Sequence, residues 1–181
     1  NNGYREHEAF LNLDKNLNVI SKILKTNYKN NFRFHLIFTY DQLLKNSKQI
    51  ENLKNDFKNL YIHGIEAHDL GPTYSISKIE IPSKEPIIVH YCDFLTDVDL
   101  DKLIDNTLKG NITAPYFNGF HPASLGNTNF AYMIIDPLGN LINLQEKKPF
   151  TNNRIQEAAS TGIYGFPSYG LFMELAKRLF E

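Results

Sequence analysis

The chain has 181 residues, and its 19 basic and 20 acidic side chains leave a formal net charge of -1. This length suits about one domain with a sizeable core, and the balanced charge excludes the overall basic field that gathers a protein on nucleic acid or on an anionic membrane. The single cysteine, Cys92, excludes an internal disulfide, and no apolar stretch is long enough to span a bilayer. We therefore expect a cytoplasmic protein with neither nucleic acid nor membrane as a partner.

The first half of the sequence alternates between helical and strand periodicity. Helices are predicted over 16–28, from a cap at Asp41 to Phe57, and in a short segment with Pro72 in its first turn. Strands are predicted over 32–40, 60–65 and 86–91. This alternation indicates an α/β fold with a mixed, mostly parallel sheet.

The second half changes to shorter, β-type pieces between two helices. Helices are predicted over 96–108 and from about Ser168 onward, and strands over 111–117, 130–136, 140–146 and 160–166. The run from Asp136 through Pro137 and Gly139 to Asn140 predicts a turn that joins two of these strands in a hairpin.

Asp93 directly follows the apolar strand over 86–91, so its carboxylate is expected at a strand tip. In open α/β sheets ligands bind outside the carboxyl ends of strands, and Mg²⁺ takes one or two such carboxylates together with phosphate oxygens. The alternative is that Asp93 caps the acidic helix that follows it. Asp97 and Asp99 form a DxD triplet, but a solvated first helical turn explains them better.

Two polar groups in the last third of the chain are candidates for binding an acceptor. Glu146 can accept hydrogen bonds from sugar or amine donors, and Lys147 can hold a phosphate; the alternative is an exposed surface pair. In Ser160-Thr161-Gly162, the glycine permits close approach of a ligand or of another backbone, and the alternative is a strand that crosses the core.

Two loops carry weaker signals. Leu70-Gly71-Pro72 can present backbone amides and leave room for a base, or it can be a tight turn alone. Gly119 and His121 lie in a loop whose imidazole can meet a substrate, although packing or solvation is the commoner role of a loop histidine. No zinc-ligand spacing is present, and Cys92 at a strand end is better explained as a small hydrophobic side chain than as a nucleophile.

In order, five motifs resemble the successive motifs of bacterial sugar-phosphate nucleotidyltransferase-like proteins from capsule and lipooligosaccharide clusters. They are Gly71-Pro72, Tyr91-Cys92-Asp93-Phe94, Gly119-Phe120-His121-Pro122, Glu146-Lys147 and Ser160-Thr161-Gly162-Ile163-Tyr164. The resemblance covers most of the chain. It implies the nucleotide-diphospho-sugar transferase fold, a Rossmann-like three-layer α/β sandwich related to the GT-A fold, with residues 1–181 in one domain.

The resemblance also implies a reaction and a role for each motif. A phosphomonoester oxygen of a phosphorylated acceptor would attack the α-phosphorus of a nucleoside triphosphate and release pyrophosphate, in the synthesis of surface polysaccharide. Positioning and charge neutralisation carry most of such catalysis. Leu70, Gly71 and Pro72 would meet the nucleotide, Asp93 would bind Mg²⁺ and the nucleotide, and Lys147 would act with Asp93 in catalysis. The acceptor would be bound by Gly119, His121, Glu146, Lys147, Ser160, Thr161 and Gly162. The base, the acceptor and a homo-oligomeric state are left open.

Two features keep other interpretations open. The family's Gly-rich, arginine-containing loop and its second metal carboxylate are expected outside this sequence, at its two ends, and Glu8 stands where the family has a lysine. A carboxylate that faces a triphosphate is electrostatically unfavourable. The first alternative is therefore a catalytically degenerate relative that binds a nucleotide or a partner protein. The second is a GT-A glycosyltransferase that uses Asp97 and Asp99.

Overall fold

A computed structural model describes residues 8–14, 17–27, 31–121 and 130–181 of the chain. The chain forms two compact units. The first unit comprises Asn1–Glu85, Cys92–Leu95 and Ser168–Glu181, and the second comprises Pro86–Tyr91 and Thr96–Pro167. Helices and strands occur in both units, so the predicted mixed α/β character is confirmed. No helix in the described ranges is long and apolar enough to cross a membrane.

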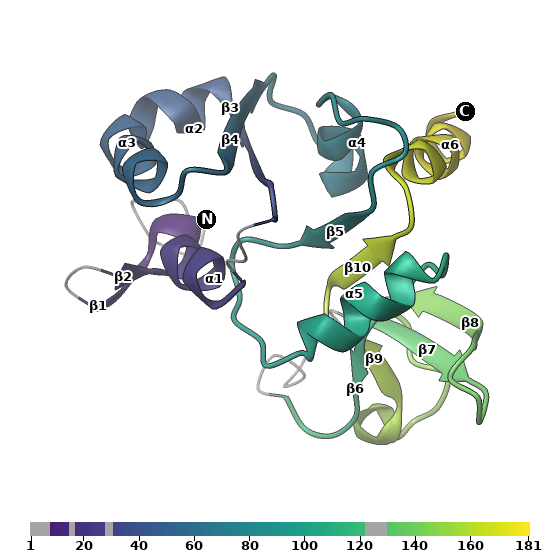
Figure 1. The fold of residues 1–181 in the computed structure, drawn as a ribbon. Coiled ribbons are helices and arrows are strands. Elements are labelled where there is room, and N and C mark those ends of the chain that lie inside the picture. The colour runs from purple at the N-terminus through teal and green to yellow at the C-terminus, as the bar shows by residue number, and fades with distance from the viewer. Residues whose placement is uncertain (1–7, 15–16, 28–30, 122–129) are drawn as a thin grey trace. The chain divides into compact units, whose positions relative to one another are not determined.

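The first unit contains the parallel strands and most of the helices (Figure 1). Its elements are η1 (Glu8–Phe10), β1 (Asn12–Asp14), β2 (Leu17–Asn18), α1 (Val19–Asn27), β3 (Phe34–Thr39), α2 (Tyr40–Lys45), α3 (Ser47–Asp56), β4 (Leu60–Ile65), α4 (Gly71–Ser77) and α6 (Tyr169–Phe180). Strands β3 and β4 pair in parallel, and β1 pairs antiparallel with β2. Among the described strands, β3 and β4 form the only parallel pair, so a mostly parallel sheet is not shown.

The second unit is antiparallel. Its elements are β5 (Ile87–His90), α5 (Leu100–Leu108), β6 (Tyr116–Phe117), β7 (Ala131–Ile135), β8 (Leu141–Glu146), η3 (Arg154–Gln156), β9 (Ala158–Ser160) and β10 (Ile163–Phe166). Strand β5 pairs with β10, and a four-stranded sheet has the order β6-β9-β7-β8. The predicted hairpin is confirmed, because β7 and β8 are joined by a turn in which the Asp136 carboxylate accepts hydrogen bonds from Leu138 N and from both nitrogens of Asn140.

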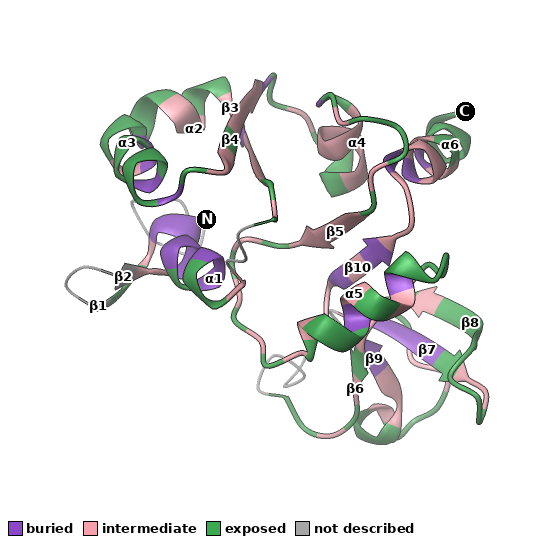
Figure 2. Cartoon of the chain, viewed as in Figure 1, coloured by how far each residue is buried: buried purple, intermediate pink, exposed green. Residues whose placement is uncertain are grey.

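One face of the β3–β4 pair covers the core of the first unit. Alternate residues of a strand point to opposite faces, and here Phe38 is buried while Leu36 and Ile62 pack against the same apolar cluster. Helix α1 contributes Ile20 and Leu24 to this core, and α3 contributes Ile50 and Leu53; the buried turns of α1 are purple in Figure 2. Cys92 also packs against the cluster, as the interpretation of a small hydrophobic side chain requires.

The helix predicted from Asp41 to Phe57 is two helices, and its cap lies two residues earlier, at Thr39 within the expected strand. Thr39 caps α2: its hydroxyl accepts a hydrogen bond from Gln42 N, and the Gln42 side chain accepts one from Thr39 N, which is a capping box. Asn46 separates α2 from α3, and its side-chain amide donates to Gln42 O at 2.8 Å. The same carbonyl accepts from Asn46 N at 3.0 Å, so both the amide and the side chain of Asn46 close the end of α2.

The strand predicted over 160–166 is also divided. Gly162 has a φ of 79°, in the left-handed region that favours glycine, and it separates β9 from β10. The final helix begins as predicted, because Ser168 caps α6 by accepting a hydrogen bond from Leu171 N at 3.1 Å.

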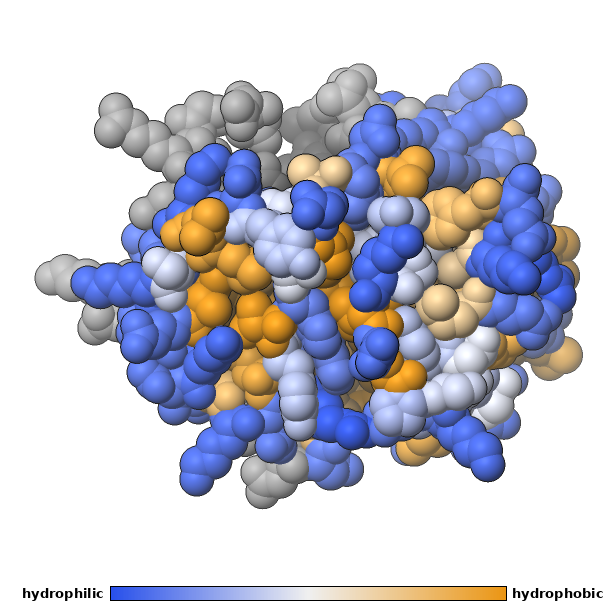
Figure 3. Space-filling model, turned by 90° about the horizontal axis from the view of Figure 1, so that it is seen from above, coloured by the Kyte–Doolittle hydropathy of each residue, from blue (hydrophilic) through white to orange (hydrophobic). Residues whose placement is uncertain are grey.

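Apolar side chains are also exposed. On the face seen in Figure 3, apolar residues in orange are interrupted by hydrophilic residues in blue. Isolated exposed apolar side chains are normal for a folded chain and need no explanation. A group of them on one strand is different, and such a group lies on β8 and the turn before it, where Leu138, Leu141, Ile142 and Leu144 are all exposed.

Candidate functional site

The predicted site residues fall into two groups, one in each unit. Leu70, Gly71, Pro72 and Asp93 lie in the first unit. The second unit contains Gly119, His121, Glu146, Lys147, Ser160, Thr161 and Gly162. Pro122, which completes one predicted motif, lies outside the described residues. The two groups match the division between nucleotide-binding and acceptor-binding residues that the sequence predicts, and each group is described by itself.

The turn at Leu70 begins helix α4, as predicted. Leu70 is the N-cap residue, and a proline occupies the first turn. A methyl group added at Gly71 would meet no atom within 4 Å, so the backbone there is open to approach. His68 holds the turn from the preceding loop, since its ring accepts a hydrogen bond from Leu70 N at 3.2 Å and contacts the Ser75 hydroxyl at 2.9 Å. Sequence reasoning missed His68, which has no motif around it.

Asp93 is exposed in an irregular segment after β5, so its predicted place beyond a strand end is confirmed. The alternative role as a helix cap is wrong, because Asp99 caps α5 by accepting a hydrogen bond from Lys102 N at 3.0 Å. This bond also occupies a carboxylate of the DxD triplet. The Asp93 carboxylate is thus left outside the helix, where a ligand can reach it.

A magnesium ion would find one carboxylate at Asp93. Within the described ranges, no group of three or more histidine, cysteine, aspartate or glutamate side chains is arranged to hold a metal ion. The residues therefore do not form an all-protein cage. A Mg²⁺ ion held by the single Asp93 carboxylate would take the rest of its shell from phosphate oxygens and water.

The segment Ser160-Thr161-Gly162 forms a hydrogen-bonded turn. The buried Ser160 hydroxyl accepts from Gly162 N at 3.1 Å and lies 2.9 Å from the Tyr164 hydroxyl. Both the amide and the hydroxyl of Thr161 donate to Pro115 O, each at 3.1 Å. The polar side chains of Ser160 and Thr161 are thus engaged within the fold, and the segment fixes the path of the chain between β9 and β10.

Strand β8 ends at Glu146, as expected for this acid-base pair. Lys147 follows with a φ of 56°, the only left-handed non-glycine residue in the described part of the chain. Its amide donates to Phe130 O at 2.9 Å, which fixes the turn while both side chains of the pair remain exposed. Neither Glu146 nor Lys147 forms an ion pair with another described residue, so their charges remain available to a ligand.

His121 belongs to a small aromatic cluster in the second unit. Its ring lies 5.7 Å from that of Phe117 and 5.5 Å from that of Phe130, and the two phenylalanine rings are 5.2 Å apart. Because Phe130 also accepts the hydrogen bond from the Lys147 amide, the cluster links His121 to the turn at the end of β8. Gly119 fixes the loop before His121, since its amide donates to Ile155 O at 2.8 Å.

Glu157 is a structural residue of this region that sequence reasoning missed. Its carboxylate accepts hydrogen bonds from the amides of Phe150 and Thr151 and from the Thr151 hydroxyl, at 2.6–2.8 Å. Burial acts to raise the pKa of Glu157, but the hydrogen bonds from Thr151 and Phe150 outweigh it and hold the pKa below its ordinary value. The loop that follows Lys147 is therefore tied to the start of β9.

A histidine pair, also missed, lies on the other face of the β3–β4 pair. His35 Nδ1 and His63 Nε2 are 2.9 Å apart, so one nitrogen donates and the other accepts. The ring centroids are 5.1 Å apart and the planes differ by 12°; with the nitrogens this close, the rings meet edge to edge in nearly one plane. Burial lowers the pKa of both histidines, and His63 and Arg33 lower that of His35 further.

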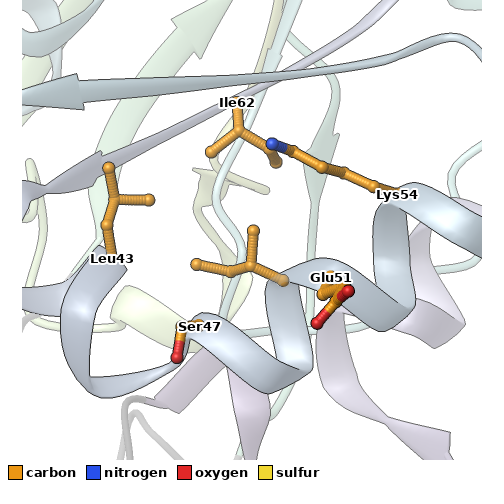
Figure 4. A pocket seen from close by; sticks show the side chains of 6 residues that line it. Leu43, Ser47, Glu51, Lys54 and Ile62 are labelled. Carbon is orange, nitrogen blue, oxygen red and sulfur yellow. The ribbon is translucent and has the colours of Figure 1, made fainter.

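The first unit also has an open hollow of about 380 Å³ between α2, α3 and β4 (Figure 4). It is lined by Leu43, Ser47, Ile50, Glu51, Lys54 and Ile62. None of these is a predicted site residue. Most of the lining is apolar, and Ile50 and Ile62 belong to the adjoining core, so the hollow is an uncovered margin of that core.

Comparison with known proteins gives a relative by fold. No family model and no curated protein matches the sequence. A solved structure, that of the nucleoside-diphosphate-sugar pyrophosphorylase from Vibrio cholerae RC9, matches with a TM-score of 0.70 and 15% sequence identity. The match covers 99% of this chain and 72% of that one. The two proteins therefore share a fold, which runs through nearly the whole chain described here.

Proposed function

We propose that this chain is a nucleotidyltransferase that transfers a nucleoside monophosphate from a nucleoside triphosphate to a sugar phosphate or a related phosphomonoester. Pyrophosphate is the second product, and the activated sugar serves capsule or surface polysaccharide synthesis. The observation that carries this proposal is the fold shared, over 99% of the chain, with a protein named as a nucleoside-diphosphate-sugar pyrophosphorylase. A Rossmann-like three-layer sandwich of the GT-A type belongs to the same proposal.

The first unit would bind the nucleotide. Open space at Gly71 leaves room for a base beside the Leu70–Pro72 turn. The exposed Asp93 carboxylate would hold Mg²⁺, which would neutralise charge on the phosphates. Phosphoryl chemistry depends mainly on positioning and on such neutralisation, and Asp93 would be the ligand that the described residues supply to it.

The second unit would bind the phosphorylated acceptor. Lys147 would contact the acceptor phosphate, because its exposed ammonium group has no carboxylate partner among the described residues. Glu146 would accept hydrogen bonds from acceptor hydroxyl or amine groups, and His121 would line the same region. Ser160, Thr161 and Gly162 would act indirectly in this proposal, since their hydrogen bonds hold the turn that precedes β10.

The test is Mg²⁺-dependent pyrophosphate release with each of the four common nucleoside triphosphates and a panel of sugar and alditol phosphates. In the full-length protein, Asp93→Asn should lower kcat/KM roughly 100-fold or more. Asp97→Asn is the matched control, an exposed aspartate of the same irregular segment, and it should leave turnover within about twofold. Turnover that survives Asp93→Asn would refute the assignment of the metal site.

The same experiment separates the alternatives. A glycosyltransferase would release no pyrophosphate here; release of a nucleoside diphosphate from a nucleotide sugar, lost with Asp97→Asn, would favour that interpretation. Calorimetric binding of a nucleoside triphosphate with no pyrophosphate released from any acceptor would favour a non-catalytic relative.

A further inference from the structure

Strand β8 is an edge strand whose backbone groups face outward. It pairs only with β7 among the described strands, at one end of the four-stranded sheet (Figure 1). The backbone of Lys147 faces β7, because its amide donates to Phe130 O. In an antiparallel pair the backbone groups of alternate residues face the same way, so those of Asn143 and Gln145 also face β7. The N–H and C=O groups of Leu144 and Glu146 therefore point away from β7. The Leu144 amide in fact donates to its neighbour's side chain, Asn143 Oδ1, at 2.8 Å.

From Asn143 to Gln145 this edge lacks the features that usually keep an edge strand from pairing. Natural edges are protected by charged residues, prolines or bulges. From Leu138 to Gln145 no residue is charged, and Ile142 and Leu144 are 64% and 41% exposed. A bulge does occur, because Ile134 pairs with Asn143 while Ile135 pairs with Leu141. It lies at the beginning of the strand and leaves the part from Asn143 to Glu146 regular.

We propose that β8 pairs with β8 of a second copy of this chain, antiparallel about a twofold axis at Leu144. The outward N–H of Leu144 would then exchange its bond to Asn143 Oδ1 for the Leu144 carbonyl of the other copy, and the two exposed Leu144 side chains would pack against each other at the axis. Antiparallel pairs of apolar residues stabilise each other in this way.

Side-chain chemistry favours the same register. Pairing about Leu144 places Asn143 of one copy opposite Gln145 of the other. Each of these side chains carries an amide that can both donate and accept a hydrogen bond, so the two can face each other across the pair.

Charge complementarity at the two ends identifies the partner as a second copy. Antiparallel pairing brings the end of β8 in one copy, with Lys147 and Lys148, toward the hairpin turn of the other, where the half-buried, hydrogen-bonded Asp136 carboxylate lies. The twofold axis produces this attraction twice. The regular pairing is short, so it would bury much less surface than the roughly 1,600 Å² of a standard stable interface. The dimer should therefore be weak and dependent on concentration. The dimer does not require the proposed enzymatic activity, but it would bring Asp136 of the second copy toward Lys147, which that activity assigns to the acceptor phosphate.

The test is sedimentation of the wild-type protein from about 10 µM to about 1 mM, a range that brackets a weak dimer. We expect a shift from the 20.9 kDa monomer to twice that mass, reduced by added salt and by Lys148→Glu because the end contacts are ionic. Leu144→Lys places two cations at the axis and should abolish the dimer. Leu44→Lys, at a 76% exposed leucine of the first unit, is the matched control and should leave dimerisation unchanged.

A cross-linking test does not depend on how Leu144→Lys folds. Opposed residues of a hydrogen-bonded antiparallel pair have Cα atoms about 5.5 Å apart, within reach of a disulfide. With oxidised glutathione as the oxidant, Leu144→Cys should form a covalent dimer at least about tenfold faster than Leu44→Cys. A monomer throughout the concentration range, a dimer that survives Leu144→Lys, or equal cross-linking of the two cysteine variants would overturn the proposal.

Discussion

Gly165 is where the structure makes its sharpest prediction about stability. Gly165 of β10 and Thr113 form a bridge in which each amide donates to the other's carbonyl, at 2.8 and 2.9 Å. A Cβ atom on Gly165 would lie 2.2 Å from Thr107 Oγ1 and 2.3 Å from Thr113 Oγ1. These two hydroxyls are hydrogen-bonded to each other at 2.7 Å, and Thr107 is 2% exposed. Neither hydroxyl can move without losing a buried bond.

The cost of Gly165→Ala follows from these contacts. Overpacking a well-packed site costs about 1–3 kcal/mol, and loss of the bond between the threonine hydroxyls adds about 1 kcal/mol. We therefore expect a loss of about 2–4 kcal/mol in the free energy of unfolding, measured by urea denaturation with an unchanged m-value. Gly139→Ala is not a suitable control, because Gly139 has a positive φ that alanine would strain. The matched control is Gly165→Ala in a protein that lacks both threonine hydroxyls.

Removing both hydroxyls should remove most of the penalty. In a Thr107→Ala/Thr113→Ala background the nearest remaining contact is Thr107 Cβ at 3.3 Å, so Gly165→Ala should cost less than about 1 kcal/mol there. A similar loss in both backgrounds would mean that the penalty comes from the backbone and not from the threonine hydroxyls, and the reasoning would fail.

Three further predictions concern single side chains. Tyr169→Phe should cost about 1–3 kcal/mol by urea denaturation, because the hydroxyl donates to Ile79 O at 2.6 Å and to Ile76 O at 3.1 Å. Tyr164→Phe, at a half-buried residue whose hydroxyl lies 2.9 Å from Ser160 Oγ, should cost less. Folding lowers the pKa values of His35 and His63 below the ordinary 6.5, so it favours their neutral forms. The resulting stability is complete above pH 6.5 and is lost as the pH falls through 6.5 toward the folded pKa values. His63→Gln should therefore flatten the dependence of the denaturation midpoint on pH between about 7 and 5. Lys147→Gly should raise the unfolding free energy by up to about 1 kcal/mol, because it relieves a left-handed φ of 56°, and a loss of stability would show that no strain is stored there.

Local patterns predicted the elements well where one periodicity dominated. The strand Leu60–Ile65 and the start of the last helix at about Ser168 agree with the prediction because alternation and helical periodicity act within a few residues. The single helix expected from Asp41 to Phe57 failed at Asn46, whose side-chain bond to Gln42 O is set by the geometry of the helix end. Strand direction was harder still, because parallel and antiparallel pairing depends on contacts distant in sequence, and most described pairs are antiparallel.

The candidate site shows the same difference between local and distant information. Asp93 could be predicted because a carboxylate after an apolar run marks a strand end, and the competing cap role was decided by Asp99, a residue equally plausible from the sequence. His35 and His63 are 28 positions apart, and only the register of β3 on β4 brings their nitrogens within 2.9 Å. No pattern within either strand contains that information.

The turn at Lys147 connects stability with the proposed chemistry. An ordinary strand would place Glu146 and Lys147 on opposite faces, where they could not serve one ligand. The strand instead ends at Glu146, and Lys147 adopts a left-handed conformation that costs about 1 kcal/mol and is held by the hydrogen bond to Phe130 O. Glycine would adopt this conformation without strain, but it would bring no charge. If Lys147 holds the acceptor phosphate, Lys147→Gly should stabilise the fold and abolish turnover together, and this opposite pair of effects would distinguish a binding lysine from one that only closes a turn.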